Sequence, residues 1–319
     1  MMILQRRLSS SIDAIYRSLK RRKEKLEQLL ESELMTVKSI EPFKYDELSI
    51  DEQEEVEAQV EGETDVFDIE ELRVEISVLT DLVQKAERLV YQDVEVKYAE
   101  LESTLFGKDG LLSKGEKILI FTESKDTLYY LERKLLNHVP EITKIVGQFS
   151  MDQRREQVEK FRNEVQIMLV TDAGGESINL QFCNQMINYD IPWNPNRLEQ
   201  RMGRIHRIEQ KNEVFIFNLV ARNTREGDVL IRLLNKMNQM REDLGQEQVY
   251  DFIGEVLEEN NIELANLMER AISGRENLDE LVAMMEKTLS DEHKRLLELA
   301  KQERLDESSF DLPGARRAY

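Results

Sequence analysis

Residues 168–180 read Met168-Leu-Val-Thr-Asp-Ala-Gly-Gly-Glu-Ser-Ile-Asn-Leu180, which places a hydroxyl and two adjacent glycines directly after a short apolar run. The run predicts a buried strand, and ligands of open α/β sheets bind at the carboxyl ends of such strands. There Thr171 can hydrogen-bond a phosphate, while Gly174 and Gly175 lack a Cβ and let the backbone approach one closely. Taken alone, the segment is explained more simply by a tight turn from strand to helix.

Short apolar runs recur on both sides of this segment and alternate with amphipathic stretches, a pattern typical of parallel βαβ units. The runs cover 117–121, 143–146, 166–171, 185–189 and 214–220. Helices are predicted after Ser124, after Ser150 and over 196–208, and Ser150 with Gln153 has the spacing of a capping box. The sequence therefore predicts an α/β fold with a parallel sheet flanked by helices.

A basic segment begins about thirty residues after the glycine turn and reads Gln200-Arg-Met-Gly-Arg-Ile-His-Arg-Ile-Glu-Gln210. One helix is predicted to carry all three arginines, and the three-residue spacing of Arg204 and Arg207 puts both on one face. Each guanidinium there can offer a planar fork to phosphate oxygens. Gly203 inside a helix would cost ~1 kcal/mol relative to Ala, which indicates that something packs closely against it. A solvated basic stripe is the alternative interpretation.

Four segments, in this order, resemble motifs IV, V, Va and VI of the superfamily 2 helicases. They are Lys117-Ile-Leu-Ile-Phe-Thr-Glu123, residues 171–180, Asp190-Ile-Pro-Trp-Asn-Pro195 and residues 200–210. The Trp-Asn-Pro triplet and the Arg-Ile-His-Arg-Ile-x-Gln ending resemble the Swi/Snf-like branch, particularly bacterial members related to the RNA-polymerase-recycling ATPase. The resemblance covers about 112–244 and implies a second RecA-like lobe that closes over ATP held by a first lobe.

The resemblance also implies roles for residues at matching positions. Arg204 and Arg207 match the motif VI arginines that reach the β- and γ-phosphates, and Gln200 matches the glutamine that couples nucleotide to nucleic acid. Gly175 and Glu176 match positions where motif V borders the nucleotide. An arginine finger stabilises charge on the transferring phosphoryl group and is worth ~10³–10⁵ in rate.

Nucleic-acid contacts are implied at four further positions. Thr171 and Gly174 match positions where motif V touches the strand backbone. Thr122 and Ser124 are similar in position to motif IV phosphate contacts, although helix capping explains them equally well. The chain departs from the family pattern at Ser177, where a second glycine is common, and at Glu209, where motif VI commonly has Gly. Neither departure removes an arginine.

The sequence contains no G-x-x-x-x-G-K-[ST] phosphate loop to cradle a β-phosphate and hold Mg²⁺. Acidic tetrads at 46–49 and 291–294 do not follow apolar strands, so we do not interpret them as the acidic Mg²⁺ box. We therefore expect ATP and Mg²⁺ to be held mainly by a first lobe that is absent from this chain, and the chain alone to be inactive.

The formal net charge of −20 argues at first against a nucleic-acid partner, because Lys and Arg drive phosphate binding. Its distribution changes that conclusion. Fourteen Asp or Glu residues against Lys44 alone lie between 41 and 71, and the last ninety residues are also acidic, but basic side chains dominate 197–225. A basic face on an acidic protein remains compatible with a nucleic-acid partner, and the resemblance favours duplex DNA.

Helical spacing predicts one long helix over 4–34 and a second over 69–105 that packs on the first. The chain is therefore expected to have three parts: a helical insertion over 1–110 with an acidic linker at about 41–71, a RecA-like lobe over 111–245, and an acidic helical extension over 246–319. The acidic helices would suit a protein partner.

No run approaches the ~18 apolar residues that a membrane span needs, and the first residues lack a secretory signal. Cys183 is the one cysteine and there are three histidines, so neither a disulfide framework nor a metal site is indicated. These features predict a soluble, cytoplasmic protein without membrane contact. A non-catalytic nucleic-acid-binding or protein-interaction module is the alternative to a motor lobe.

Overall fold

The computed structural model describes residues 2–32, 69–93, 95–175, 178–205, 212–222, 224–244, 270, 277–291 and 294–295. The chain divides into two compact units, Met1–Pro192 with Arg197–Ala221, and Trp193–Asn196 with Arg222–Tyr319. The predicted acidic linker and most of the predicted C-terminal extension lie outside the described residues. The three-part division therefore stays a prediction.

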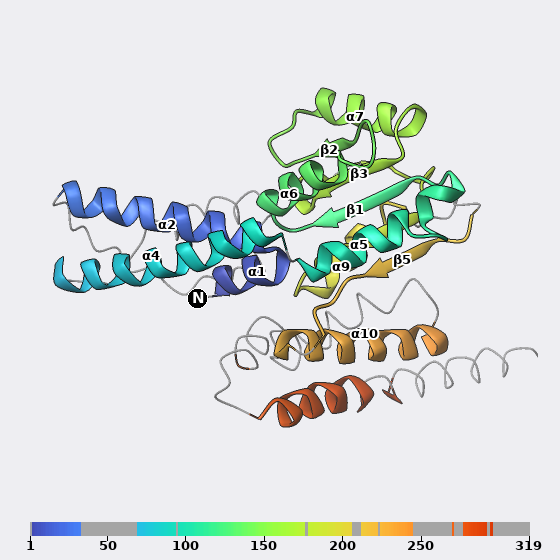
Figure 1. The fold of residues 1–319 in the computed structure, drawn as a ribbon. Helices are drawn as coiled ribbons and strands as arrows, with labels where there is room; N and C mark the ends of the chain where they lie inside the picture. The colour runs from blue at the N-terminus through green and yellow to red at the C-terminus, as the bar shows by residue number, and fades with distance from the viewer. Residues whose placement is uncertain are drawn as a thin grey trace, which may run out of the picture. The chain divides into compact units, whose positions relative to one another are not determined.

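The first unit is built on a five-stranded parallel sheet (Figure 1). Its strands are β1 (Ile118–Thr122), β2 (Thr143–Ile145), β3 (Ile167–Thr171), β4 (Gln185–Asn188) and β5 (Phe215–Asn218), in the spatial order β2-β3-β1-β4-β5. Each predicted apolar run overlaps one strand, so the predicted fold is confirmed. The register pairs Thr122 with Thr171, which brings the carboxyl ends of β1 and β3 side by side.

Alternate residues of the central strands face two apolar layers, as strand geometry requires. Ile118 and Ile120 pack with α5 (Val96–Phe106) and α6 (Lys125–Leu135). Leu119 and Phe121 belong to the opposite layer, to which α7 (Met151–Asn163) contributes Phe161. A short 3₁₀ turn over Leu111–Lys114 precedes β1. The sheet is thus covered on both faces and fixes the positions of the loops at its carboxyl edge.

Two of the predicted helix starts are confirmed by their caps. Ser124 Oγ accepts the Thr127 N–H at 3.3 Å at the start of α6. At α7, Ser150 Oγ accepts the Gln153 N–H at 3.3 Å while Gln153 Oε1 accepts the Ser150 N–H at 2.9 Å. Both bonds of the predicted capping box are therefore present.

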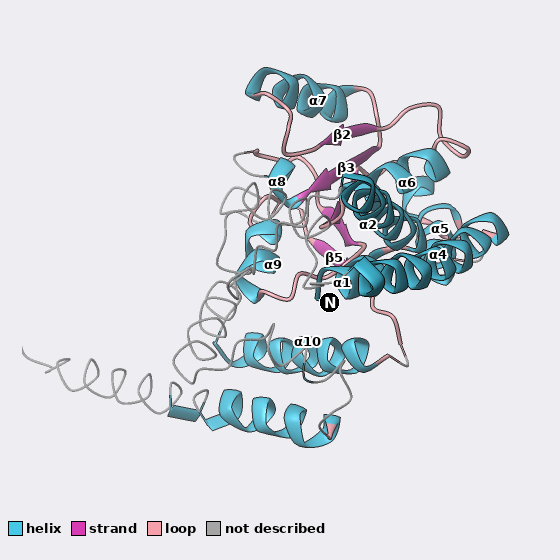
Figure 2. Cartoon of the chain, turned by 90° about the vertical axis from the view of Figure 1, so that its left-hand side faces the viewer, coloured by secondary structure: helices cyan, strands magenta, loops and turns pink. Residues whose placement is uncertain are grey.

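The N-terminal helices are more broken than predicted. The helix predicted over 4–34 is α1 (Met2–Ser10) and α2 (Ile12–Ser32), because Ser11 Oγ accepts the Ala14 N–H at 3.1 Å and so caps a new helix. The helix predicted over 69–105 is likewise α4 (Ile69–Gln92) and α5, with Asp93 in a left-handed conformation between them (φ 53°). The predicted packing is confirmed, since α2 and α4 run side by side (Figure 2) over a shared apolar seam.

The basic helix predicted over 196–208 is also shorter in the structure. It is α9 (Pro195–Met202), and the N–H groups of Arg204 and Ile205 then bond to the carbonyls three residues earlier, at 3.1 and 3.0 Å. Gly203 therefore lies just beyond the helix, a position where glycine is common, and not inside it. Arg204 occupies the turn after α9, so the prediction that one helix carries all three arginines is wrong. Arg207 lies outside the described residues, so its predicted shared face with Arg204 stays a prediction.

The second unit contains α10 (Arg225–Leu244) and a helical stretch over 278–291. Within it, Trp193 Nε1 donates to Glu226 Oε1 at 2.9 Å. Among the residues that the structure describes, no helix is long and apolar enough to cross a membrane.

Candidate functional site

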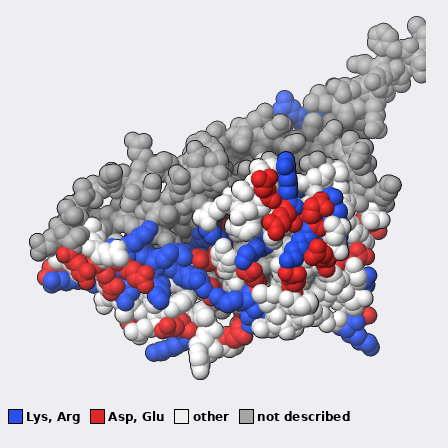
Figure 3. Space-filling model, turned by 90° about the horizontal axis from the view of Figure 1, so that it is seen from above, with Lys and Arg blue, Asp and Glu red and all other residues white. Residues whose placement is uncertain are grey.

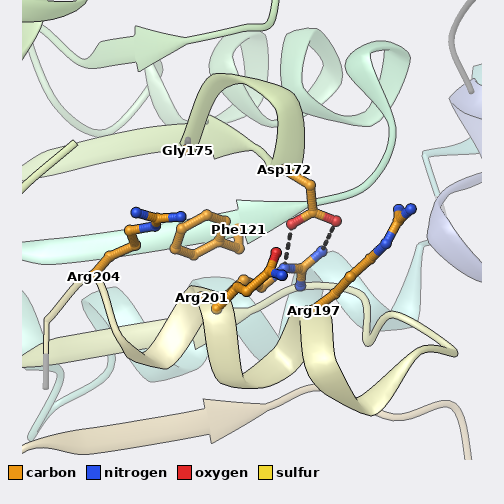
Figure 4. Close-up of a pocket in the computed structure, with 7 residues that line it drawn as sticks. Phe121, Asp172, Gly175, Arg197, Arg201 and Arg204 are labelled. Atoms are coloured by element: carbon orange, nitrogen blue, oxygen red, sulfur yellow. Dashed lines mark hydrogen bonds and ion pairs between the residues drawn. The ribbon is translucent and has the colours of Figure 1, made fainter. Parts of the chain in front are cut away.

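A small open pocket lies at the carboxyl edge of the sheet (Figure 4). It brings together the end of β1, the four-residue helix α8 (Asp172–Gly175) that follows β3, α9, and the turn beyond α9. The lining residues are Phe121, Asp172, Gly175, Arg197, Gln200, Arg201 and Arg204. Three arginines against one aspartate give this lining an excess of positive charge, which suits an anionic ligand.

Asp172 and Arg201 form a buried, two-point ion pair in the wall of this pocket. Arg201 Nε donates to Asp172 Oδ1 at 2.5 Å and Nη2 donates to Oδ2 at 2.9 Å. The remaining terminal nitrogen donates to Asn188 Oδ1 at 3.1 Å and to the Asp190 carbonyl at 2.7 Å. Burial works to lower the pKa of Arg201, but Asp172 outweighs it, so the pKa is raised and the guanidinium stays charged. Arg201 thus acts within the lobe and not toward solvent.

The pair also sets the position of the neighbouring side chains. The Arg201 guanidinium lies 5.3 Å from the centre of the Phe121 ring. In the close-up, Arg204 and Arg197 lie on opposite sides of the pair (Figure 4). The Arg204 carbonyl accepts the Leu180 N–H at 3.1 Å, which ties the turn after α9 to the segment after α8. The two motif-bearing segments are therefore joined through both side chains and backbone.

Both glycines of the turn are required by packing inside the lobe. A Cβ on Gly174 would lie 2.3 Å from the Ile145 carbonyl oxygen, and one on Gly175 would lie 2.9 Å from Phe121 Cε1. Packing of α8 against the strands thus accounts for the glycines without a ligand. Close approach of a phosphate or strand to these positions stays a prediction.

The predicted hydroxyl contacts are engaged within the protein. Thr171 Oγ1 accepts the Gly174 N–H at 3.2 Å, and Thr122 Oγ1 donates to Asp190 Oδ2 at 2.6 Å. Ser124 caps α6 and also accepts a bond from Arg7 Nη1. All three side chains are buried at the carboxyl edge, so their predicted role toward nucleic acid has no direct support in the geometry.

Asp190 connects this edge to helix α1, a link that the sequence did not suggest. Its Oδ2 accepts from Ser10 Oγ at 2.6 Å as well as from Thr122, and its Oδ1 accepts the Glu123 N–H at 2.7 Å. Arg6 lies 3.6 Å from the Glu123 carboxylate. Burial raises the pKa of Glu123 to about 7, against the opposing charge of Arg6. The N-terminal helix is therefore part of the site's support.

Among the predicted site residues, the structure brings Gly175, Gln200 and Arg204 into one pocket. Gln200 is exposed and Arg204 is partly exposed. Glu176 and Arg207 lie outside the described residues, so their places stay predictions. Sequence reasoning assigned no role to Asp172, Arg197 or Arg201. Two features of the sequence could have indicated this ion pair. Asp172 directly follows an apolar strand, and the basic segment 200–210 contains three arginines that need acidic partners if they are buried.

Comparison with known proteins agrees with this architecture. Residues 96–209 match the helicase conserved C-terminal domain family. The uncharacterized ATP-dependent helicase YqhH of Bacillus subtilis is 42% identical over 131 residues, which are 41% of this chain and 24% of that protein. The CHD3-type chromatin-remodeling factor CHR7 of Arabidopsis thaliana is 34% identical over 131 residues, 40% of this chain and 11% of that protein. The chain thus spans about a quarter or less of these relatives.

Two solved structures are also similar. The C-terminal part of the Fun30 ATPase domain has a TM-score of 0.39 and 19% identity, covering 88% of this chain and 76% of that one. The Sulfolobus solfataricus SWI2/SNF2 ATPase core in complex with dsDNA has a TM-score of 0.40 and 19% identity, covering 80% and 47%.

The glycine turn and most of the arginine-bearing segment lie within residues 96–209, so they are part of the helicase conserved C-terminal domain that these residues match. The relatives at 42% and 34% identity support a C-terminal lobe similar to those of Swi/Snf-like superfamily 2 ATPases.

Proposed function

We propose that this chain is the second motor lobe of an ATP-driven translocase on double-stranded DNA. In this proposal Arg204 and Arg207 stabilise charge on ATP phosphates held by a first lobe, and Gln200 couples the nucleotide to the nucleic acid. The observation that carries the proposal is the pocket that Gly175, Gln200 and Arg204 share at the carboxyl edge of a parallel sheet.

The chemistry of the lining fits a polyphosphate. Asp172 is matched by both of its bonds to Arg201, and two further arginines, Arg197 and Arg204, line the same pocket. Planar guanidinium groups are well suited to phosphate oxygens. ATP supplies the phosphoryl group to be transferred, and this chain supplies positive charge beside it.

Magnesium belongs to the first lobe in this proposal. Within the described residues, no group of three or more His, Cys, Asp or Glu side chains could hold a metal ion. The chain also lacks a phosphate loop. We therefore expect the 319-residue chain alone to hydrolyse ATP no faster than buffer. Measurable DNA-stimulated turnover by this chain would contradict the proposal that a first lobe holds ATP and Mg²⁺.

The partner nucleic acid is tested by ATP hydrolysis in the protein that contains both lobes. Turnover would be compared with duplex DNA, single-stranded DNA and RNA of equal length and concentration. Duplex DNA is expected to give the largest stimulation. Stimulation by RNA alone would reject a DNA translocase while leaving the motor assignment in place.

A further inference from the structure

We propose that a basic cluster on α2 and α6 forms a second nucleic-acid surface, which binds the phosphate backbone of duplex DNA. The cluster consists of Arg17, Lys20 and Arg21 of α2 with Lys125 and Arg133 of α6. The inference rests on the proposed function and extends the DNA contact to helices outside the four sequence motifs.

Helical spacing puts the three α2 members together. Arg17 and Arg21 are four residues apart, and Lys20 is three residues after Arg17, so all three project from neighbouring positions on one side of the helix. Leu19 and Leu26 belong to the apolar seam with α4. The cluster therefore lies on a part of α2 that the α4 seam does not use.

The acidic partners of this cluster lie beneath it. Asp13 has a side chain only 4% exposed and accepts from both Arg17 Nε, at 2.5 Å, and Arg133 Nη2, at 2.9 Å. The two arginine side chains remain 41% and 54% exposed. A guanidinium has five N–H donors, so the bond to Asp13 orients each arginine and leaves donors directed toward solvent.

The Arg21–Asp126 pair has the same layering. Arg21 Nη2 donates to Asp126 Oδ2 at 2.8 Å, and the side chains are 39% and 17% exposed respectively. In both cases the guanidinium is more exposed than the carboxylate to which it donates. In an ordinary surface ion pair both side chains are exposed to a similar degree. Here the arginines are more exposed than their aspartates, so the surface presents positive charge although each arginine has an acidic partner.

The cluster lies beside the proposed DNA-binding edge. Helix α6 starts at Lys125, three residues after β1 ends at Thr122. Seen from above, Lys and Arg side chains form a continuous stretch over the N-terminal helices (Figure 3). The α6 members of the cluster therefore lie on the helix that starts at the carboxyl edge of the sheet, the edge that also carries the pocket.

Duplex DNA is the anion that this surface suits best. The chain as a whole carries a net charge of −20, so an anionic partner has to bind through a local concentration of Lys and Arg. Duplex DNA has a dense line of phosphates and releases condensed counterions when Lys and Arg neutralise them. The binding free energy from counterion release grows with the number of phosphates contacted, so a surface with several Lys and Arg side chains binds duplex DNA more tightly than one with a single basic side chain.

The test is fluorescence anisotropy of a labelled duplex with the 319-residue chain, repeated over a range of salt concentrations. The main variant is Lys20→Gln/Arg21→Gln/Lys125→Gln. The matched control is Arg155→Gln/Lys160→Gln/Arg162→Gln on α7, which removes the same charge from a different helix. The double variant Lys20→Gln/Lys125→Gln keeps the ion pairs to Asp13 and Asp126 and so guards against misfolding.

The wild-type chain is expected to bind with a dissociation constant of roughly 10⁻⁴–10⁻⁶ M. Each lost phosphate contact lowers the salt slope by about 1, so the slope should fall by about 3 in the triple variant and about 2 in the double variant. The α7 control should keep most of the wild-type slope and affinity.

Binding of a labelled polyglutamate peptide is measured in parallel with the same variants. Three results would overturn the proposal: a triple variant that matches the α7 control, a wild-type chain that does not bind duplex, or a triple variant that loses polyglutamate binding and retains duplex binding. The last result would assign the cluster to an acidic protein. Duplex-stimulated ATP hydrolysis by the two-lobe protein is measured separately, so it distinguishes failure of this surface from failure of the proposed function.

Discussion

Arg201 of α9 donates two hydrogen bonds to the carboxylate of Asp172, which directly follows β3, and its side chain is only 2% exposed. Each residue lies in a different sequence motif, and the pair joins the two segments that line the pocket. Arg204 follows Arg201 by three residues and lines the same pocket, so we expect the pair to help hold Arg204 in place.

Asp172→Ala should destabilise the chain by about 3–5 kcal/mol, because it leaves the buried Arg201 charge without its partner. Urea unfolding followed by circular dichroism measures the change. Glu159→Ala is the control, since it removes the exposed pair with Arg162 and should cost less than about 1 kcal/mol. Equal effects of the two substitutions would show that the buried pair does not support the fold.

Gly174→Ala and Gly175→Ala should differ in severity. The new Cβ at Gly174 meets the backbone oxygen of Ile145 at 2.3 Å, which cannot move without shifting β2. At Gly175 it meets the Phe121 ring at 2.9 Å, and a ring can rotate or shift. Overpacking typically costs about 1–3 kcal/mol, and Gly174→Ala should lie at or above that range.

The contact between Gly175 and the Phe121 ring can also be tested by removing the ring. Phe121→Leu removes the ring that crowds Gly175, so it should recover part of the stability lost in Gly175→Ala and none of that lost in Gly174→Ala. Thermal unfolding of the three single variants and the two double variants measures this. Equal recovery in both backgrounds would refute the proposed contacts.

Stability should fall as pH rises from about 4.5 to about 7 through the raised pKa of Glu123. In this window the folded chain keeps a proton on the Glu123 carboxyl that the unfolded chain has already lost, so rising pH favours unfolding. Glu123→Gln never ionises. The stability difference between wild type and Glu123→Gln should therefore shift against the wild type by about 1–3 kcal/mol between pH 5 and pH 8. Parallel pH profiles would contradict the raised pKa.

The sheet could be predicted from the sequence because each strand is marked by a short apolar run of neighbouring residues. Five apolar runs of strand length, separated by amphipathic stretches, overlap the five strands. The capping box at Ser150 and Gln153 likewise depends on two side chains three residues apart. Both features are decided by neighbouring residues, and neither needs knowledge of the tertiary contacts.

Contacts between distant segments explain most of what could not be predicted. Local spacing puts Gly203 in the middle of a helix, although glycine is also common just past helix ends. The helix in fact ends at Met202, and the Leu180 N–H bonds to the Arg204 carbonyl in the turn beyond it. Thr122 could be assigned to nucleic acid because nothing in its neighbourhood reveals Asp190, which follows β4. Ser11, within an apparently continuous helical pattern, breaks the helix because its side chain competes for the backbone N–H of Ala14.

The central claim is that Arg204 and Arg207 act on a nucleotide held by another lobe. Its most direct test is the turnover number for duplex-stimulated ATP hydrolysis in the two-lobe protein, measured for Arg204→Ala and Arg207→Ala. Arg222→Ala, at an exposed arginine outside the pocket, is the matched control. We predict that kcat falls by about 10³–10⁵ in the first two variants, with duplex affinity largely retained, and is unchanged in the control. Wild-type turnover in both Arg204→Ala and Arg207→Ala would contradict the account.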